Sequence, residues 1–330
     1  MQAGKALDGT GRGAVSGRSH PEQSMTHPPF WQPALARNQI WRSALGTVLI
    51  FAVWVAASFG AITGGAALIG RPVWEVARGN DPASAAAFFA SFIGFHIALA
   101  IVLPLLHRRR YRSLFGPEGR LNPAHLWRGA AVTLGIATVL YALIAVEHAV
   151  LPAGVSPPLE LNLPPATWAL ILLPALALIF LQVLAEEAVF RGYLLQQLRA
   201  RFRSPLIWAV APSLLFGLLH FDATTYGTIN AAAYVLNATL MGTFAAFVTL
   251  RTGNLAAAIG LHFGNNAALA AIGLKGNLAG FSLFVVEMEL RSGYATYSIL
   301  TQTAAMAVIF ALWWRWMARH RPIANSGDAA

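Results

Sequence analysis

The chain contains no cysteine and little charge. Of its 330 residues, none is Cys and only 11% are Asp, Glu, Lys or Arg. The lack of Cys excludes disulfides, thiolate metal ligands and a cysteine nucleophile. A soluble domain usually carries roughly 25% charged residues, whereas hydrophobic residues make up 57% of this chain. The composition therefore argues against a soluble globular protein.

We also expect no signal peptide, no internal repeat and no nucleic-acid partner. Residues 1–38 are rich in Gly, Ser, Gln and Pro and contain no long apolar run. We therefore expect a disordered cytoplasmic tail there and no signal peptide. No internal repeat is visible, which weighs against a transporter built from repeats. The net charge of +10 does not indicate a nucleic-acid partner, because the Arg residues flank apolar segments, where they set topology and favour anionic lipid.

The chain does contain eight apolar stretches of about 20 residues, the length that crosses a hydrocarbon core of roughly 30 Å. We predict an all-α, polytopic membrane bundle of about eight transmembrane helices. The fourth helix is expected to continue past the membrane through Leu198. The stretches lie near residues 43–69, 84–106, 129–151, 167–190, 205–221, 228–250, 254–273 and 295–316.

The basic residues predict the orientation. If the N-terminus is cytoplasmic, 19 of the 23 Lys and Arg residues lie in cytoplasmic segments, as the positive-inside rule requires. Both termini are therefore expected in the cytoplasm of a multi-pass protein of the cell inner (plasma) membrane. The external loop at 274–294 fits either an interfacial helix or a half-inserted strand.

We divide the chain accordingly. The predicted segments are the tail (1–38), N-terminal transmembrane helices (39–160), a catalytic membrane core (165–275), an external loop with the last helix (276–318) and a cytoplasmic tail (319–330).

Charged side chains inside a membrane helix usually have a function, because each costs about 2.5–3.5 kcal/mol on insertion scales. The fourth stretch carries Glu186, Glu187 and Arg191. Glu187 and Arg191 are four residues apart, so they can pair on one helix face. Glu186 lies about 100° around the helix and has no cation within this motif, and such a buried carboxylate can serve as a general base. The alternative is a structural Glu–Arg pair that ties helices together, which leaves Glu186 unexplained.

Two other stretches carry residues spaced four apart, so that each pair shares a helix face. Phe216 and His220 end the fifth stretch, where the ring can pack beside the imidazole, and His262 and Asn266 lie in the seventh. An imidazole beside an amide can donate hydrogen bonds to an oxyanion. The alternatives are an interior His with satisfied hydrogen bonds and an Asn that joins helices. Weaker candidates are His96, Glu147 and His148.

The candidate residues are predicted to lie at similar depths. With a rise of 1.5 Å per residue, Glu187 lies about 18 Å from the cytoplasmic marker Arg199 and His220 about 25 Å from Arg203. The same estimate gives about 16 Å for His262 and about 22 Å for Asn266. Because three helices present polar groups within about 10 Å of one another in depth, the sequence predicts one site.

The three motifs together resemble those of the CPBP family, the CAAX prenyl endopeptidases and bacteriocin-processing enzymes also called the Abi family. The resemblance covers about residues 165–275. Each motif alone is weak, but three in the right order on separate helices are specific. The resemblance implies an all-helical intramembrane endopeptidase with an interior cavity. The motifs are Glu186-Glu187-x-x-x-Arg191, Phe216-x-x-x-His220 and His262-x-x-x-Asn266.

The resemblance also implies roles for these residues. Glu186 and His220 would activate a water molecule. His262 and Asn266 would form the oxyanion hole. Glu187 and Arg191, with Phe216 as a further supporting residue, would position this machinery.

No cofactor is expected. A catalytic Zn²⁺ takes three protein ligands and a water molecule, and Glu186, His220 and His262 would be those ligands here. However, the sequence has no His-Glu-x-x-His motif, and the resemblance favours chemistry that does not need a metal.

The expected partners are the lipid bilayer and a membrane protein or peptide as substrate, with no nucleic acid. The sequence does not identify that substrate or the oligomeric state. The alternative function is non-proteolytic: an immunity or regulatory membrane protein, or a proton-coupled transporter that uses the same Glu and His residues.

Overall fold

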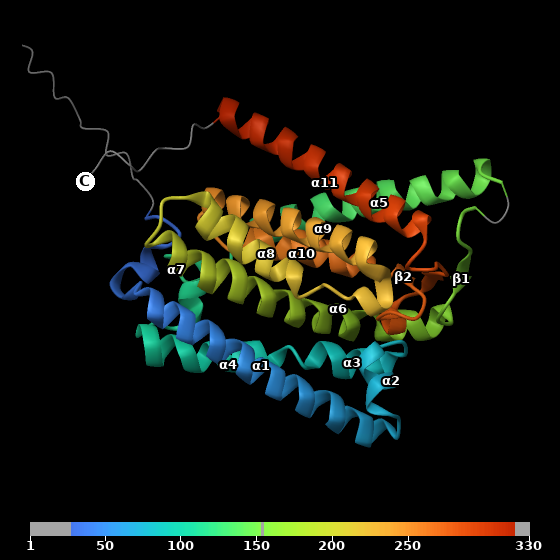
Figure 1. The fold of residues 1–330 in the computed structure, drawn as a ribbon, viewed down its shortest axis with the longest axis horizontal. Coiled ribbons are helices and arrows are strands. Elements are labelled where there is room, and N and C mark those ends of the chain that lie inside the picture. Colours follow the sequence, from blue (N-terminus) through green and yellow to red (C-terminus); the bar gives the residue numbers. More distant parts are fainter. Residues whose placement is uncertain (1–27, 153–154, 321–330) are drawn as a thin grey trace, which may run out of the picture.

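In the computed structural model, residues 28–152 and 155–320 are described, and most of them are helical (Figure 1). Segments η1, η3 and η6 are 3₁₀-helices, while η2, η4 and η5 are π-helical turns that continue neighbouring α-helices. In chain order the elements are η1 (Gln32–Arg37), α1 (Ile40–Ile69), α2 (Val73–Arg78), α3 (Pro82–Ala90), α4 (Ile93–Val102), η2 (Leu103–His107), η3 (Tyr111–Phe115), α5 (Pro123–Val150), β1 (Leu159–Leu161), α6 (Pro165–Glu187), η4 (Ala188–Leu194), α7 (Leu195–Arg199), η5 (Leu206–Val210), α8 (Ala211–Leu218), α9 (Ala223–Thr252), α10 (Ala256–Ala268), β2 (Ile272–Leu274), η6 (Ala279–Phe281), β3 (Phe284–Val286) and α11 (Gly293–His320).

The predicted all-α, polytopic membrane bundle is confirmed, but the count of eight spans is not. Within the described ranges, six helical segments are long and apolar enough to cross a membrane. The predicted spans at 205–221 and 254–273 contain shorter helices, Leu206–Leu218 and α10. The six long segments are α1, Pro82–His107, α5, Pro165–Arg199, α9 and α11 as far as Trp316.

Burial separates central helices from peripheral ones. In α9, 44% of the most apolar window is buried, against 11% in α1 and 11% in α11. Because the apolar surfaces of α1 and α11 are exposed in the isolated chain, they suit contact with lipid. Figure 1 shows the start of α1 and the end of α11 at the same end of the molecule, with the strands at the opposite end.

Polar side chains mark where several helices begin. Asp81, Asn122 and Asp222 each accept hydrogen bonds from two backbone N–H groups in the first turn of the following helix. Such an N-cap stabilises a helix by about 1 kcal/mol. Asp222 therefore starts α9, immediately after the segment that carries His220.

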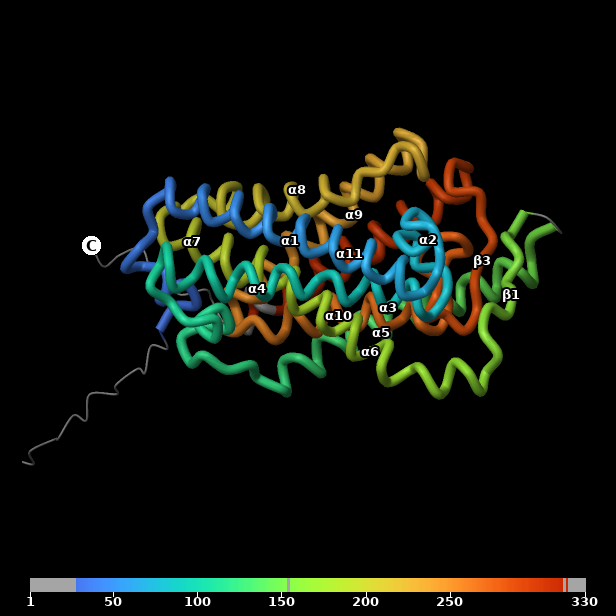
Figure 2. Tube along the Cα trace, turned by 90° about the horizontal axis from the view of Figure 1, so that it is seen from below, coloured from blue at the N-terminus to red at the C-terminus, as the bar shows by residue number. Residues whose placement is uncertain are grey.

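A small sheet lies at the end of the bundle away from the start of α1 (Figure 2). Strand β3 pairs antiparallel with β1 and parallel with β2. Lys275 Nζ lies 2.8 Å from both Glu160 Oε2 and Glu287 Oε2, and its hydrogen bond to Glu287 holds the pKa of that carboxyl below its usual value. Of the two predicted alternatives for residues 274–294, the interfacial helix is wrong, because the segment contains strand β3, which pairs with β2 and with residues 159–161.

The structure also corrects part of the predicted N-terminal tail. Residues 1–27 lie outside the described residues, but η1 packs on the bundle, with Phe30 1% and Ala34 0% exposed. The Arg199 guanidinium lies 4.2 Å from the centre of the Trp31 ring, and Asn38 donates to the Ala200 carbonyl. The tail prediction failed here because it rested on composition and missed these apolar side chains.

Helix α10 packs directly against the backbone of α5. A Cβ atom at Gly260 would overlap the Leu126 carbonyl oxygen, and one at Gly129 would lie 2.5 Å from the Ala257 carbonyl oxygen. Small residues allow this close approach, as is typical of helix pairs in membranes. The contact fixes the position of the helix that carries His262 and Asn266.

Candidate active site

The first motif lies where α6 continues into the π-helical turn η4. Glu186 and Glu187 end α6, and Arg191 lies within η4. All three side chains are buried, with 8%, 1% and 2% of their surface exposed. π-Helical turns are rare and occur often at functional sites. The helix also continues to Arg199, as the sequence predicted.

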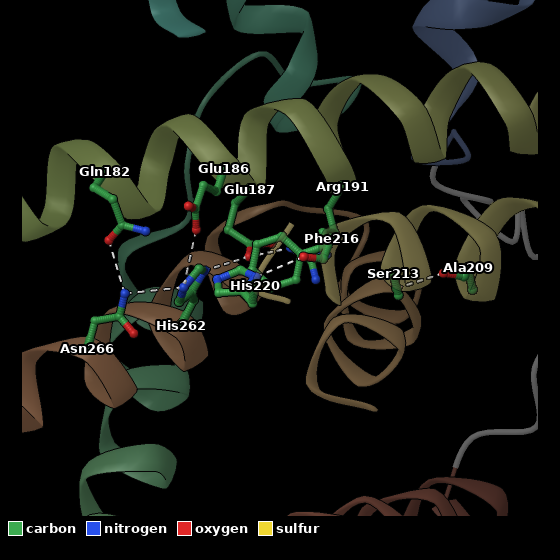
Figure 3. A network of polar contacts seen from close by, with 10 residues as sticks. All are labelled: Gln182, Glu186, Glu187, Arg191, Ala209, Ser213, Phe216, His220, His262 and Asn266. Atoms are coloured by element: carbon green, nitrogen blue, oxygen red, sulfur yellow. Dashed lines mark hydrogen bonds and ion pairs between the residues drawn. The ribbon is translucent and has the colours of Figure 1, made fainter. Parts of the chain in front are cut away.

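Glu187 organises the centre of the cluster (Figure 3). Its Oε1 accepts hydrogen bonds from Arg191 Nη1 at 2.8 Å and from His262 Nδ1 at 2.9 Å. The Arg191 guanidinium carbon lies 4.8 Å from the centre of the Phe216 ring. The pairing of Glu187 with Arg191 agrees with the spacing in the sequence, and the bond to His262 adds a partner from another helix.

Glu186 has a different environment although it is the neighbouring residue. Its Oε2 is buried and accepts no hydrogen bond. His262 Nε2 lies 3.5 Å from this oxygen, which is too long for a good hydrogen bond. Leaving a buried carboxylate oxygen unpaired costs free energy, so this atom is suited to receive a proton or a small polar ligand.

His262 and Asn266 face α6 from α10. Because Glu187 is an acceptor, His262 Nδ1 carries a proton, and Nε2 is then free to accept in the neutral ring. Asn266 Nδ2 lies 3.3 Å from that Nε2 and donates to Gln182 Oε1 at 3.0 Å. The site therefore contains Gln182, one turn before Glu186 on α6.

The short helix α8 carries Phe216, and His220 follows two residues after its last residue, Leu218. His220 Nδ1 donates to the Phe216 carbonyl at 2.8 Å, one of the carbonyls left unpaired at the end of a helix. The Phe216 ring lies between two imidazoles, with centroids 4.7 Å from His220 and 5.9 Å from His262. His220 Nε2 makes no hydrogen bond to any described residue and can accept a proton.

Helix α9 closes the site along one face. Tyr234, Ala238 and Gly242 are spaced four residues apart and so share that face. The Tyr234 ring meets His220 with centroids 5.8 Å apart. A Cβ atom at Gly242 would lie 2.5 Å from Arg191 Nη2, so the guanidinium occupies the space that the missing side chain leaves.

The weaker candidates of the sequence lie elsewhere and have structural contacts. His96 joins α4 to Tyr111 and to the Leu181 carbonyl. Glu147 is buried and accepts hydrogen bonds from Tyr294 and Tyr297, which link α5 to α11. His148 Nδ1 lies 2.9 Å from the Ser156 hydroxyl, in the segment that follows α5.

The residues named as possible zinc ligands are not arranged as a metal site. In the described ranges, no three His, Asp or Glu side chains are grouped so that they could hold a metal ion. Glu186 and His262 approach each other, but no hydrogen bond or ion pair joins His220 to either of them. We therefore derive no chemistry through a metal.

The structure brings all seven predicted side chains into one connected cluster. Sequence reasoning missed Gln182, Tyr234 and Gly242. Gln182 had a signal, since it is a polar residue on the same face of an apolar helix as Glu186. Tyr234 and Gly242 had none, because an aromatic and a glycine are common in membrane helices.

Comparison with known proteins agrees with the motifs. Residues 166–268 match the family model described as type II CAAX prenyl endopeptidase Rce1-like, which confirms the resemblance over this part of the chain. The chain is also 29% identical over 178 residues to "Uncharacterized protein YyaK" of Bacillus subtilis (strain 168). That alignment covers 52% of this chain and 54% of the relative, so the similarity spans about half of each protein.

Proposed function

We propose that this multi-pass membrane protein is an intramembrane endopeptidase that hydrolyses a peptide bond of a membrane-associated protein or peptide. The observation that carries the proposal is Glu186, a buried carboxylate with an unpaired Oε2 beside His262. The match of residues 166–268 to a CAAX endopeptidase family supports the same class of reaction. We place the protein in the cell inner membrane.

In the proposed reaction Glu186 and His220 activate a water molecule. Glu186 accepts a proton from the water while the oxygen forms a bond to the scissile carbonyl carbon. The carbon–nitrogen bond then breaks, and the amine leaves with a proton delivered by protonated Glu186 or His220. A general base of this kind contributes about 10²–10⁴-fold to a rate.

His262 and Asn266 are proposed to stabilise the oxyanion. Because His262 Nδ1 donates to Glu187, its Nε2 donates only when the ring is doubly protonated. Asn266 Nδ2 already faces the same Nε2, so a substrate oxygen would replace one of these contacts. The loss of one such donor lowers kcat by about 10²–10³-fold in other proteases.

The proposal is tested with purified protein in detergent and a pool of synthetic peptides. The pool includes peptides that end in a prenylated cysteine motif, and products are identified by mass spectrometry. We expect cleavage by the parent protein, and a loss of at least 100-fold in Glu186→Gln and in His220→Ala. Glu118→Gln is the matched control, because this carboxylate is exposed and remote from the cluster.

Full cleavage by both variants would exclude the mechanism. Proton uptake into liposomes that is abolished by Glu187→Gln, without any cleavage by the parent, would instead support a transporter.

A further inference from the structure

Two stacked tyrosine rings, Tyr234 and Tyr226, lie between His220 of the candidate active site and the loop that carries Asn277. The Tyr234 ring meets His220 on one side and stacks on Tyr226 on the other, with centroids 5.7 Å apart and ring planes 9° from parallel. The Tyr226 hydroxyl accepts a hydrogen bond from Asn277 Nδ2. The Tyr234 ring is therefore held between the His220 imidazole and Tyr226, which the loop residue Asn277 binds.

This stacking depends on a break in α9. Eight residues in a regular helix rise about 12 Å, so two tyrosines eight positions apart would not stack face to face. Gly227 adopts φ 71° and ψ 160°, which is not helical. Glycine tolerates this conformation and other residues do so only under strain. The break turns Tyr226 back onto Tyr234.

The His220 ring needs such a support. Beyond Cβ, rotation of an imidazole is broad and roughly two-fold, so one hydrogen bond at Nδ1 does not hold the ring alone. Phe216 packs on the ring from α8 at 4.7 Å, and Tyr234 packs on it from α9.

We propose that Tyr234 is a positioning residue, which keeps the His220 ring oriented with Nδ1 bound to the Phe216 carbonyl and Nε2 free to accept a proton. Tyr226 and Asn277 support Tyr234 from the outer side. This inference rests on the proposed function, because a fixed His220 tautomer matters for activity only if His220 Nε2 accepts a proton in the reaction. It adds a fourth helix, α9, to the three that carry the sequence motifs.

The first experiment does not depend on proteolysis. Full-length protein labelled with ¹⁵N-histidine in lipid nanodiscs is compared with the Tyr234→Ala and Tyr234→Phe variants by NMR, and the His220 signal is assigned with His220→Gln. We expect the parent and Tyr234→Phe to show one His220 tautomer, protonated at Nδ1. Tyr234→Ala is expected to show a mixture of both tautomers, with Nε2 protonated in a substantial fraction.

Phe247→Ala is the matched control. Phe247 is also an aromatic residue of α9, but it packs on Trp208 and Trp314 and not on His220. If Tyr234→Ala does not fold, Tyr234→Leu removes the ring with a smaller change of volume. A single Nδ1-protonated tautomer in the folded Ala or Leu variant would overturn the proposal.

The second experiment measures catalysis on the peptide that the parent cleaves best. We expect Tyr234→Ala to lower kcat at least tenfold with KM within twofold, and Phe247→Ala to change neither by more than twofold. An unchanged kcat in Tyr234→Ala would also overturn the positioning role. If the parent cleaves no peptide, the proposed function fails, whereas the tautomer measurement still decides the role of Tyr234.

Discussion

The adjacent residues Glu186 and Glu187 differ in the hydrogen bonds that their carboxylates accept. Glu187 accepts hydrogen bonds from Arg191 and His262 through Oε1, although its Oε2 accepts none, whereas Glu186 Oε2 has only the 3.5 Å approach of His262. Removing one member of a buried ion pair leaves the other charge uncompensated, at a cost of about 3–5 kcal/mol. Removing an unpaired carboxylate does not incur that cost. At this scale, stability and catalysis are therefore expected to depend on different residues.

This separation can be measured with three single substitutions. We expect Glu187→Gln to lower the free energy of unfolding by about 3–5 kcal/mol, because Arg191 remains buried without its carboxylate. Glu186→Gln should keep the parent's thermal stability and lose cleavage. Glu75→Gln is the control, because it removes an exposed partner of Arg71, and such pairs contribute about 0–1 kcal/mol. Equal destabilisation by the Glu186 and Glu187 variants, measured by thermal unfolding in detergent, would contradict this view.

At the scale of helices, the close contact of α10 with α5 decides where His262 and Asn266 lie. Gly260 meets the backbone of α5, and Gly264 meets Ala130 and Thr133. The polar face of α10 is directed at α6 because its glycine face is occupied by α5. The glycines thus position the site without touching it.

A pair of matched glycine substitutions tests this packing. In Gly260→Ala the new methyl group would overlap the Leu126 carbonyl, and we expect a loss of about 1–3 kcal/mol in stability together with lower cleavage. At Gly135, also on α5, a Cβ atom would meet nothing within 4 Å. Gly135→Ala is therefore expected to be neutral or to stabilise by up to about 1 kcal/mol through helix propensity. Equal stability of the two variants would show that the α5–α10 contact is not tight.

At the scale of the whole molecule, the first and last long helices place the start of α1 and the end of α11 on the same side of the bundle. Figure 1 shows the start of α1 and the end of α11 at one end, opposite the sheet that holds Lys275. The two half-length helices, α8 and α10, bring His220 and Asn266 toward the interior rather than to the far surface. The candidate site therefore lies between helices of the bundle, with Glu186 and His262 buried.

The native chain has no cysteine, so single cysteines report its topology directly. We expect Glu118→Cys and Ser204→Cys to react with a membrane-impermeant maleimide only after the cytoplasmic side of spheroplasts is opened. Lys275→Cys should react in intact spheroplasts, because the predicted orientation puts the sheet on the external side. Labelling of position 275 and position 118 from the same side would exclude the proposed orientation.

The sequence by itself determined the membrane class, the positions of the apolar segments and the identity of the seven candidate site residues. These features are local, because hydrocarbon length and the cost of burying charge act on each segment separately. The i,i+4 spacing similarly determined that Glu187 pairs with Arg191. The three motifs were enough to predict that their helices would meet.

Only the tertiary structure decided which atoms meet within the site. The bond of Glu187 to His262, the partner Gln182 and the ring of Tyr234 depend on how neighbouring helices are rotated, which packing at Gly260 and Gly242 sets. Helix α10 ends early because distant backbone groups satisfy the chain beyond it, as in the pairing of β2 with β3. Contacts of this kind join residues far apart in the chain, and no periodic pattern in the sequence predicts them.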